Sequence, residues 1–444
     1  MTDLPPHNPA SLLLPDARTR ARNRAEARFR AYGFTAICVA LAMLAILLAS
    51  ILGNGLSAFR QTYISFPVLL AADKLDTSGT RDPEAMKKVT TIGYMKVIAS
   101  GLEEALKTKG IEAGNLTSKD VAALLSEEAP AAIRDRVLAD PALVGQTIPV
   151  RVLASGRIDG FFKGRVTAET AAKGTKIKPE QLALAEKLRA AGLIETRFNW
   201  AFLTAPDASE KRPEAAGLGV AIIGSLYMMI VVLALSLPIG VSAAVYLEEF
   251  APKNRFTDVI EVNIANLAAV PSIVFGILGL AVFINFAHLP QSAPLVGGLV
   301  LVLMTLPRII IPARAALKAV PPSIRDAALG VGASKMQAVF HHVLPLAAPG
   351  ILTGMIIGLA QALGETAPLL LIGMVAFVRD YPGLPPHGFL DPATALPVQI
   401  YSWTQRSDPA FVERASGAII VLLAFLLIMN AVTILLRRRF ERRW

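Results

Sequence analysis

The stretch from Val320 to Met374 reads VPPSIRDAALGVGASKMQAVFHHVLPLAAPGILTGMIIGLAQALGETAPLLLIGM. Its first half predicts a short polar helix, and its second half predicts a long apolar helix that carries one carboxylate, Glu365, near its middle. Because proline lacks a backbone N–H, we expect Pro345 to end the short helix before the long one begins. This pattern is typical of a cytoplasmic helix placed directly against a membrane span.

Small residues in the short helix indicate close contact with another protein. Ala327 and Ala328 would let a second backbone approach closely, and Gly332 would permit a turn between two short helices. An amphipathic helix that lies on the membrane without a partner is the alternative. The Leu344-Pro345 pair and the span directly after it favour docking in a partner's groove.

The spacing of these residues resembles a known loop. The EAA loop of ABC importer permeases reads E-A-A-x-x-x-G and, nine residues later, I-x-L-P, and here Asp326 replaces the usual Glu and His342 the usual Ile. The resemblance implies that residues 321–345 couple the chain to an ATPase. The residues that carry this coupling would be Asp326, Ala327, Ala328, Gly332, Leu344 and Pro345.

The composition indicates a polytopic membrane protein rather than a soluble enzyme. Of the 444 residues, 54% are hydrophobic and only 18% are charged. The formal net charge of +10 does not indicate nucleic-acid binding, because the basic residues lie where the positive-inside rule puts them. Membrane lipid is therefore an expected partner. The single cysteine, Cys38, offers no disulfide framework and no cysteine-based metal site, and we expect no cofactor.

The N-terminal region predicts a tail and a first span. Residues 1–33 are polar and rich in arginine, and we expect a disordered basic tail that stays in the cytoplasm. Residues 34–55 hold an apolar run, Phe34–Gly53, of about twenty residues, which is long enough to cross the hydrocarbon. Since no convincing cleavage site follows, we predict an uncleaved span.

Residues 56–214 form an insert of mixed, charged composition with no run long enough to span a membrane. They predict a mixed α/β domain with helices at Ala85–Leu106 and Ser118–Leu138 and strands at Thr147–Arg157 and Gly160–Thr167. Because one span precedes the insert, it should face the periplasm. Nothing in it has the pattern of a catalytic site.

Residues 215–436 predict five further spans, which gives an all-α polytopic fold with six transmembrane helices. The five are Gly217–Leu247, Val262–Phe286, Val296–Ile311, Ile351–Val378 and Ala418–Leu436. Alternate counting puts Arg255, the Arg314–Lys335 stretch and the basic tail of residues 437–444 inside, as the positive-inside rule requires. We therefore expect a multi-pass protein of the bacterial inner membrane with both termini in the cytoplasm.

Glu365 is the sharpest functional candidate. A charged side chain deep in a span costs roughly 2.5–3.5 kcal/mol to insert, so such a residue normally faces a bundle interior or a wet cavity. Thr366 follows it, and Pro368 breaks the helix just beyond, so polar backbone could face a pathway. The alternative is an ion pair that only clamps two spans, for instance with Arg308, and the two roles are compatible.

Arg308 and Arg314 lie at the inner end of the fourth span, just after two prolines. An arginine there can extend to the lipid headgroups, which is the more common role. Arg308 lies deeper and is the better candidate for contact with an oxyanion, because a guanidinium group binds phosphate bidentately. Together with Glu365 and Thr366, the two arginines are our candidates for a translocation pathway.

Three strings give a narrower resemblance. Gly364–Pro368, Val270–Gly276 and Leu396–Tyr401 are similar to strings of the PstA branch, the permeases of phosphate ABC importers. The resemblance covers residues 217–436 and the first span but not the insert. It implies an ABC importer type I permease fold. The implied partners are a homologous second permease, two ABC ATPase subunits and a periplasmic phosphate-binding protein.

The chain itself is not expected to be an enzyme. Leu329–Lys335 is glycine-containing but lacks the Gly-Lys-Ser/Thr ending and the preceding strand of a P-loop, so a separate subunit must hydrolyse ATP. Two alternatives stay open: a permease for another oxyanion such as sulfate or molybdate, and a membrane receptor that senses a ligand through the insert. A receptor function would not explain the carboxylate of Glu365 within a span or the loop at residues 321–345.

Overall fold

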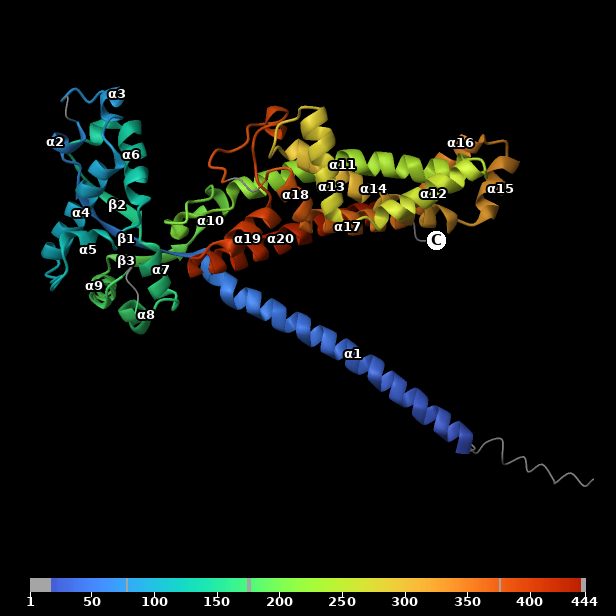
Figure 1. The fold of residues 1–444 in the computed structure, drawn as a ribbon, viewed down its shortest axis with the longest axis horizontal. Helices are drawn as coiled ribbons and strands as arrows, with labels where there is room; N and C mark the ends of the chain where they lie inside the picture. The colour runs from blue at the N-terminus through green and yellow to red at the C-terminus, as the bar shows by residue number, and fades with distance from the viewer. Residues whose placement is uncertain (1–16, 77–78, 174–176, 375–376, 441–444) are drawn as a thin grey trace, which may run out of the picture. The chain divides into compact units, whose positions relative to one another are not determined.

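The computed structural model describes residues 17–76, 79–173, 177–374 and 377–440, and the chain divides into two compact units, Met1–Gly53 and Asn54–Trp444. The described part of the first unit, residues 17–53, lies in the helix α1 (Ala17–Gly55), which contains the predicted first span (Figure 1). The expectation of a disordered tail is wrong for residues 17–33, which are helical. Alanine, arginine and glutamate favour helix, and Arg30 pairs with Glu26 one turn away. The rest of that tail lies outside the described residues.

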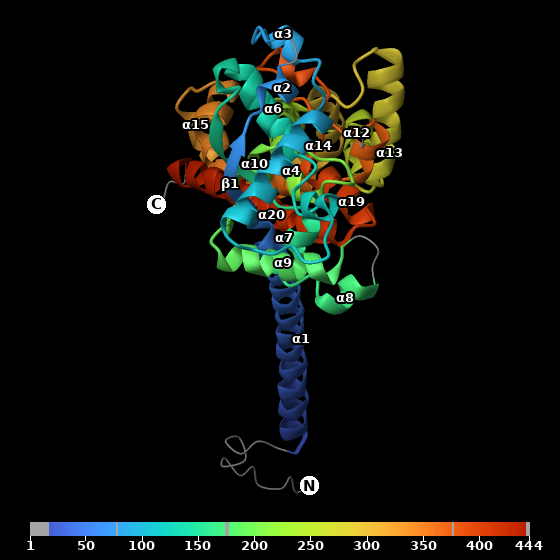
Figure 2. The same cartoon turned by 90° about the vertical axis from the view of Figure 1, so that its left-hand side faces the viewer.

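The insert is built around a three-stranded antiparallel sheet in the order β2-β1-β3. The strands are β1 (Arg60–Leu69), β2 (Thr147–Leu153) and β3 (Ile194–Phe198). A Cβ atom on Gly101 of α4 (Thr91–Thr108) would lie 2.8 Å from Val68 Cγ2, so this helix packs directly on β1 (Figure 2). The other helices of this region are α2 (Ala72–Leu75), α3 (Pro83–Met86), α5 (Ser118–Ala122), α6 (Ala129–Ala139), α7 (Gly156–Phe162), α8 (Ala168–Lys173), α9 (Pro179–Ala190) and α10 (Trp200–Thr204).

The insert is mixed α/β as predicted, but its elements differ from the expected ones. The helix predicted at Ser118–Leu138 is two helices, α5 and α6, and the strand predicted at Gly160–Thr167 is wrong because α7 occupies Gly156–Phe162. The prediction also missed β1 and β3. Proline is unusual inside a strand because it has no N–H to donate to a neighbouring strand. In β1 the Ser65 N–H donates to Leu193 O at 2.8 Å, on the side of β3, and the nitrogen of Pro67 points to the same side two residues later. Since β3 does not extend that far, no hydrogen bond is lost at Pro67.

The span bundle of the second unit is all-helical where it is described. Five helices of the described chain are long and apolar enough to cross a membrane, or six if a bent pair counts as one span, which agrees with the predicted architecture. The helices are α11 (Gly219–Val245), α12 (Arg255–Ala268), α13 (Ser272–Gly279), α14 (Pro294–Lys318), α15 (Pro322–Gly330), α16 (Lys335–Ala338), α17 (Leu344–Gly364), α18 (Ala367–Leu371), α19 (Leu396–Gln405) and α20 (Pro409–Phe440). Three π-helical segments, Tyr246–Phe250, Leu280–Phe286 and Val339–Val343, extend or join them.

The predicted span Val262–Phe286 is not one straight helix. It consists of α12 and of α13 with its π-helical extension, and the two halves are bent by 102° (Figure 1). Pro271 lies in the break with extended backbone, φ −56° and ψ 137°. Because proline lacks the N–H that would continue the hydrogen-bond ladder, the chain changes direction there.

The prediction that Pro345 ends a helix is also wrong. A single helical run extends from Lys335 to Gly364 and contains Pro345, so the predicted span at Ile351–Val378 begins earlier and ends earlier than expected. The turn before Pro345 is the π-helical segment Val339–Val343. A π-helical turn is one of the ways in which a helix takes up a missing hydrogen bond, so the short polar helix and the span form one continuous element.

Candidate functional site

Glu365 lies at a break between two helices rather than near the middle of one. α17 ends at Gly364, and Glu365 has extended backbone with φ −76° and ψ 130°. α18 begins at Ala367 and carries Pro368 in its first turn. Glu365 and Thr366 are both half-buried. The break therefore exposes helix-end backbone next to a carboxylate, as the Glu-Thr-Ala-Pro string predicted.

Two of the singled-out strings meet at this break. A Cβ atom on Gly276 of α13 would lie 2.7 Å from Pro368 Cα, so only a glycine lets α13 approach α18 this closely. The third string begins α19, where the Leu396 N–H donates to Ser225 Oγ of α11 at 2.9 Å. The strings thus mark contacts among four helices of the span bundle.

Arg308 lies in α14 and is half-buried. Its Nη1 atom is buried and has no hydrogen-bond partner in the structure. A Cβ atom on Gly358 of α17 would lie 4.0 Å from Arg308 Cβ, which places the base of this side chain against α17. Among the described residues, no carboxylate lies within 4 Å of the Arg308 guanidinium and no cationic group lies within 4 Å of the Glu365 carboxylate, so the clamp between these two residues is not formed in this conformation.

Arg314 has a different environment from Arg308. Its Nη2 atom lies 2.7 Å from Glu261 Oε1 of α12 and 3.4 Å from Glu248 Oε2 at the end of the α11 run. Arg325 of α15 lies 2.6 Å from Glu249 Oε1 and also donates to the carbonyls of Val320 and Leu317. These pairs tie α15 and α14 to the chain that follows α11.

The predicted coupling residues lie on α15, in the turn after it and in the run that follows. Gly332 has a φ of +91°, so the predicted turn between two short helices exists and requires a residue that tolerates the left-handed region. Ala327 and Asp326 are exposed, whereas Ala328 is buried against the chain itself. Only one alanine of the pair is therefore open to a partner. Leu344 is half-buried and Pro345 is exposed in the continuous helix.

Glycines on α17 set its distance from α14, a feature that the sequence analysis missed. Gly350, Gly354 and Gly358 recur every fourth residue, and a Cβ atom on Gly354 would lie 2.7 Å from Pro312 Cβ. Small residues at this spacing let membrane helices pack at short distance. The spacing of four in the sequence was the available signal.

A buried group of charges joins the insert to the first turns of α20, and sequence reasoning also missed it. We call it the junction cluster, and it consists of Asp159, Lys163, Arg165, Glu413 and Arg414. Lys163 Nζ lies 2.6 Å from Asp159 Oδ2 and 2.9 Å from Glu413 Oε1, and Arg165 pairs with Glu413 as well. The residues come from positions some 250 apart in the chain, so no local pattern could have revealed them.

Three further contacts complete the junction cluster. Arg414 donates from Nη2 to Gln61 Oε1 at 2.8 Å and to the backbone carbonyl of Glu214 at 2.9 Å. Asp159 accepts from the Thr62 N–H at 3.0 Å. Charge and hydrogen-bond partners are thus supplied from β1, α7 and α20 together, and the insert and α20 are fastened to each other.

Comparisons with known proteins agree with this architecture. Residues 236–444 match the family described as "Binding-protein-dependent transport system inner membrane component", and residues 16–172 match a "Domain of unknown function (DUF3333)". The probable ABC transporter permease protein YqgI of Bacillus subtilis is 31% identical over 49% of this chain and 76% of that relative. The phosphate transport system permease protein PstA 2 of Mycobacterium bovis is 31% identical over 56% of this chain and 79% of that relative.

A third relative, the phosphate transport system permease protein PstA of Xylella fastidiosa, is 28% identical over 51% of this chain and 77% of that relative. The matched shares of these relatives are large, whereas half of this chain or nearly so lies outside each match. The chain therefore belongs to the binding-protein-dependent transport system inner membrane components, the ABC importer permeases, in the branch of its PstA relatives.

Proposed function

We propose that this permease subunit carries inorganic phosphate across the bacterial inner membrane. The printed names of its PstA relatives support phosphate as the substrate. The observation in the structure that carries the proposal is the unpartnered Nη1 atom of Arg308, a guanidinium donor left free inside the span bundle. A guanidinium group binds the oxygens of phosphate well. Burying a donor without a partner costs free energy, so a donor kept in this state is a candidate for binding a substrate.

In this proposal Arg308 and Glu365 divide the work. The guanidinium of Arg308 makes transient hydrogen bonds to the oxyanion as it passes. An ionised Glu365 would repel an anion at close range, so it acts as a counter-charge that pairs with an arginine, here or on the partner permease, and releases it on passage. Thr366 lies at the same helix break, while Arg314 is occupied by two glutamates and is the weaker pathway candidate.

As a member of this family the chain works with ATPase and other permease subunits, and it is not itself catalytic. We further propose two ATPase subunits, a homologous second permease and a periplasmic phosphate-binding protein as the complete set. The exposed face of α15 with Asp326 and Ala327 would contact an ATPase, and the continuous run from Lys335 to Gly364 would transmit its movement to the helix break.

The coupling role of Gly332 can be separated from its backbone role. A Cβ atom there would meet nothing within 4 Å, so a larger side chain has room within this chain but is strained by the positive φ. Asparagine tolerates this conformation and leucine does not. Both Gly332→Asn and Gly332→Leu should block the ATPase contact and stop transport, with normal membrane levels. Normal transport by Gly332→Asn would remove this residue from the coupling surface.

The proposed topology places the insert in the periplasm and both termini in the cytoplasm. Cysteines introduced at two exposed serines, Ser118 in the insert and Ser323 in α15, form a matched pair. An impermeant thiol reagent should label Ser118→Cys in cells with a permeabilised outer membrane. It should label Ser323→Cys only after the inner membrane is opened. The reverse pattern would contradict the topology.

The substrate is tested by uptake in cells that lack other phosphate importers and express this chain with its partner subunits. Radiolabelled phosphate should accumulate, and excess unlabelled phosphate should compete while sulfate and molybdate do not. Arg308→Lys, which keeps the charge but loses the planar fork, should retain part of the uptake. Preferential uptake of sulfate or molybdate would make the chain a permease for that oxyanion.

A further inference from the structure

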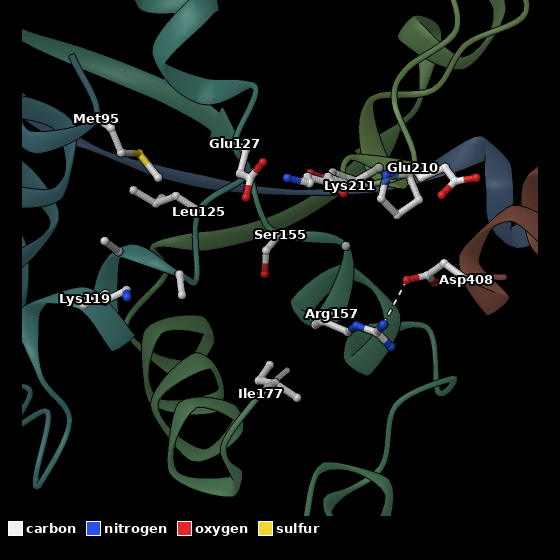
Figure 3. A pocket seen from close by; sticks show the side chains of 15 residues that line it. Met95, Lys119, Leu125, Glu127, Ser155, Arg157, Ile177, Glu210, Lys211 and Asp408 are labelled. Carbon is white, nitrogen blue, oxygen red and sulfur yellow. Dashed lines mark hydrogen bonds and ion pairs between the residues drawn. The ribbon is translucent and has the colours of Figure 1, made fainter. Parts of the chain in front are cut away.

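The insert contains a cavity of about 470 Å³ on the side that meets the span bundle. Its walls come from α5, from the start of α7, from the segment before α11 and from Asp408 just before α20 (Figure 3). Arg157 Nη2 lies 2.9 Å from Asp408 Oδ2, so an ion pair closes one side. The volume falls in the range of pockets that hold small molecules.

Glu214 lines this cavity and carries an unsatisfied acceptor just beneath the surface of the wall. Glu214 is only 6% exposed, and while its Oε1 atom accepts a hydrogen bond from Ser126 Oγ, its Oε2 atom has no partner. A Cβ atom on Gly156 would lie 2.7 Å from that Oε2 atom, so the absence of a side chain at this wall makes room for the carboxylate. Ser155 Oγ is also buried without a partner, and Figure 3 shows it pointing into the cavity.

The rest of the lining carries both signs of charge beside an apolar surface. Glu127 and Glu210 are acidic, Lys119 and Lys211 are basic, and among the described residues none of these four takes part in an ion pair. Met95, Leu125 and Ile177 supply the apolar part (Figure 3). An anion alone would face the Glu214 carboxylate. A metal is not indicated, because the described residues contain no group of three or more ligating side chains.

We propose that this cavity binds a small zwitterion of the amino-acid class, with an ammonium group, a carboxylate and a short apolar body. The ammonium group donates to Glu214 Oε2 and Ser155 Oγ after a rotation of these two buried side chains toward the cavity, the carboxylate meets Lys119 or Lys211, and the apolar body lies on Met95 and Leu125. This site is separate from the proposed oxyanion pathway and nothing in the proposed transport function requires it.

Because of where the cavity lies, a molecule bound in it would affect how firmly the insert is attached to the span bundle. Its walls belong both to the insert and to segments that lead directly into α11 and α20. A molecule bound there contacts all of them at once and therefore stabilises the attachment of the insert to the span bundle.

The test uses the purified full-length chain in detergent, with L-leucine as the probe. Its two comparators are isoamylamine, which is leucine without the carboxylate, and 4-methylpentanoate, which is leucine without the ammonium group. Leucine should raise the melting temperature in a saturable way, and each comparator should raise it less. Isothermal titration should give the same order of affinity. Glu214→Gln and Ser155→Ala should each weaken leucine binding at least tenfold. Glu104→Gln, an exposed carboxylate of α4 outside the cavity, should bind leucine as the unaltered chain does.

Ala123→Leu provides a second variant that leaves Glu214 in place and fills the mouth of the cavity, because Ala123 is exposed and lines it. It should fold normally and lose leucine binding. The proposal is overturned if leucine causes no shift in the unaltered chain, if either comparator shifts it as much as leucine does, or if Ala123→Leu binds leucine unchanged. The first outcome would mean that the cavity does not bind a small amino acid.

Discussion

Two groups of charged residues in the second unit differ in how many interaction partners they have. In the junction cluster, each buried charge has several partners: Lys163 contacts two carboxylates, and Arg414 has three acceptors within 3.5 Å. In the span bundle, Arg308 keeps a buried nitrogen without a partner, and Glu365 lies half-buried at a helix break. The first group has the ion-paired geometry of a structural joint, although Arg165 Nε and Glu413 Oε2 make no hydrogen bond. The second has the unsatisfied geometry that is typical of a working site.

The difference in pairing follows from what each group has to do. A buried charge is expensive unless it is paired, and a complete network repays that cost with fixed geometry. Charges that must release a partner during transport cannot be saturated in the same way. The two groups should therefore respond differently to mutation. Changes in the junction cluster should lower the free energy of unfolding, whereas changes at Arg308 and Glu365 should lower the rate of transport.

The largest effect on stability is expected from Glu413→Ala. The side chains of Lys163 and Glu413 are only 5% and 3% exposed, so removing this carboxylate leaves Lys163 and Arg165 with Asp159 alone. We expect a loss of about 3–5 kcal/mol in the free energy of unfolding. Thermal and denaturant unfolding of the full chain in detergent measure it. Glu84→Ala, at an exposed ion pair in the insert, is the control and should cost less than about 1 kcal/mol. Equal losses of stability in Glu413→Ala and Glu84→Ala would show that the junction cluster stabilises the chain no more than a surface ion pair does.

Glu365→Gln should act on transport instead. The amide keeps the shape of the side chain and removes its charge, so phosphate uptake should fall at least about 100-fold, which corresponds to roughly 2.7 kcal/mol. The melting temperature and the membrane level should stay unchanged. Glu365→Asp should keep partial uptake because the charge survives with a shorter reach. Glu104→Gln is the matched control on an exposed helix face. Uptake by Glu365→Gln at the unaltered rate would make this residue structural.

Arg308→Met sharpens the comparison because stability and activity should move in opposite directions. The buried Nη1 atom has no partner, so replacing the guanidinium by an apolar group of similar length should raise the free energy of unfolding by about 1 kcal/mol. Uptake should be lost at the same time. Unfolding midpoints and uptake are measured on the same variant. A marked loss of stability would show that Arg308 has a structural partner and belongs with the joint.

The smallest effect is expected at Asp120, on the surface of the insert. Hydrogen bonds from Lys178 and then from Thr117 lower the pKa of its carboxyl to about 2. Because the pKa in the folded chain lies below the ordinary value of 3.8, the stabilisation is present above pH 3.8 and is lost as the pH falls through about 2. Asp120→Asn should therefore melt slightly lower than the unaltered chain at pH 6, and the difference should vanish toward pH 2. A difference that persists at the acid end would contradict this assignment.

Burial acts in the other direction on Glu214, the carboxyl in the wall of the cavity. Desolvation raises the pKa of Glu214, although the hydrogen bond from Ser126 opposes the shift. For a carboxyl with a raised pKa, the folded chain holds the proton to higher pH, so its contribution to stability falls as the pH rises from the ordinary value through the raised one. Asp120 and Glu214 thus give opposite pH dependences within one insert.

The sequence by itself determined the features that depend on local chemistry. The apolar runs predicted the spans, the string at Gly364–Pro368 predicted a broken helix beside a carboxylate, and Gly332 predicted a turn. It erred at Pro345, which was predicted to end a helix but lies inside one after a π-helical turn, and it missed the strand β1, which contains Pro67. In both cases the missing N–H was harmless because of the backbone around it.

Only the tertiary structure decided which charges meet. Lys163 and Glu413, or Gln61 and Arg414, lie hundreds of residues apart, and a single sequence contains no period or spacing that relates them. The same holds for the cavity, whose walls come from six separate segments, and for the contact of Gly276 with Pro368. Local propensity fixes helices and turns because it acts over a few residues. Pairing of buried charges is set by packing, because the cost of leaving one unpaired arises only when the whole chain has closed around it.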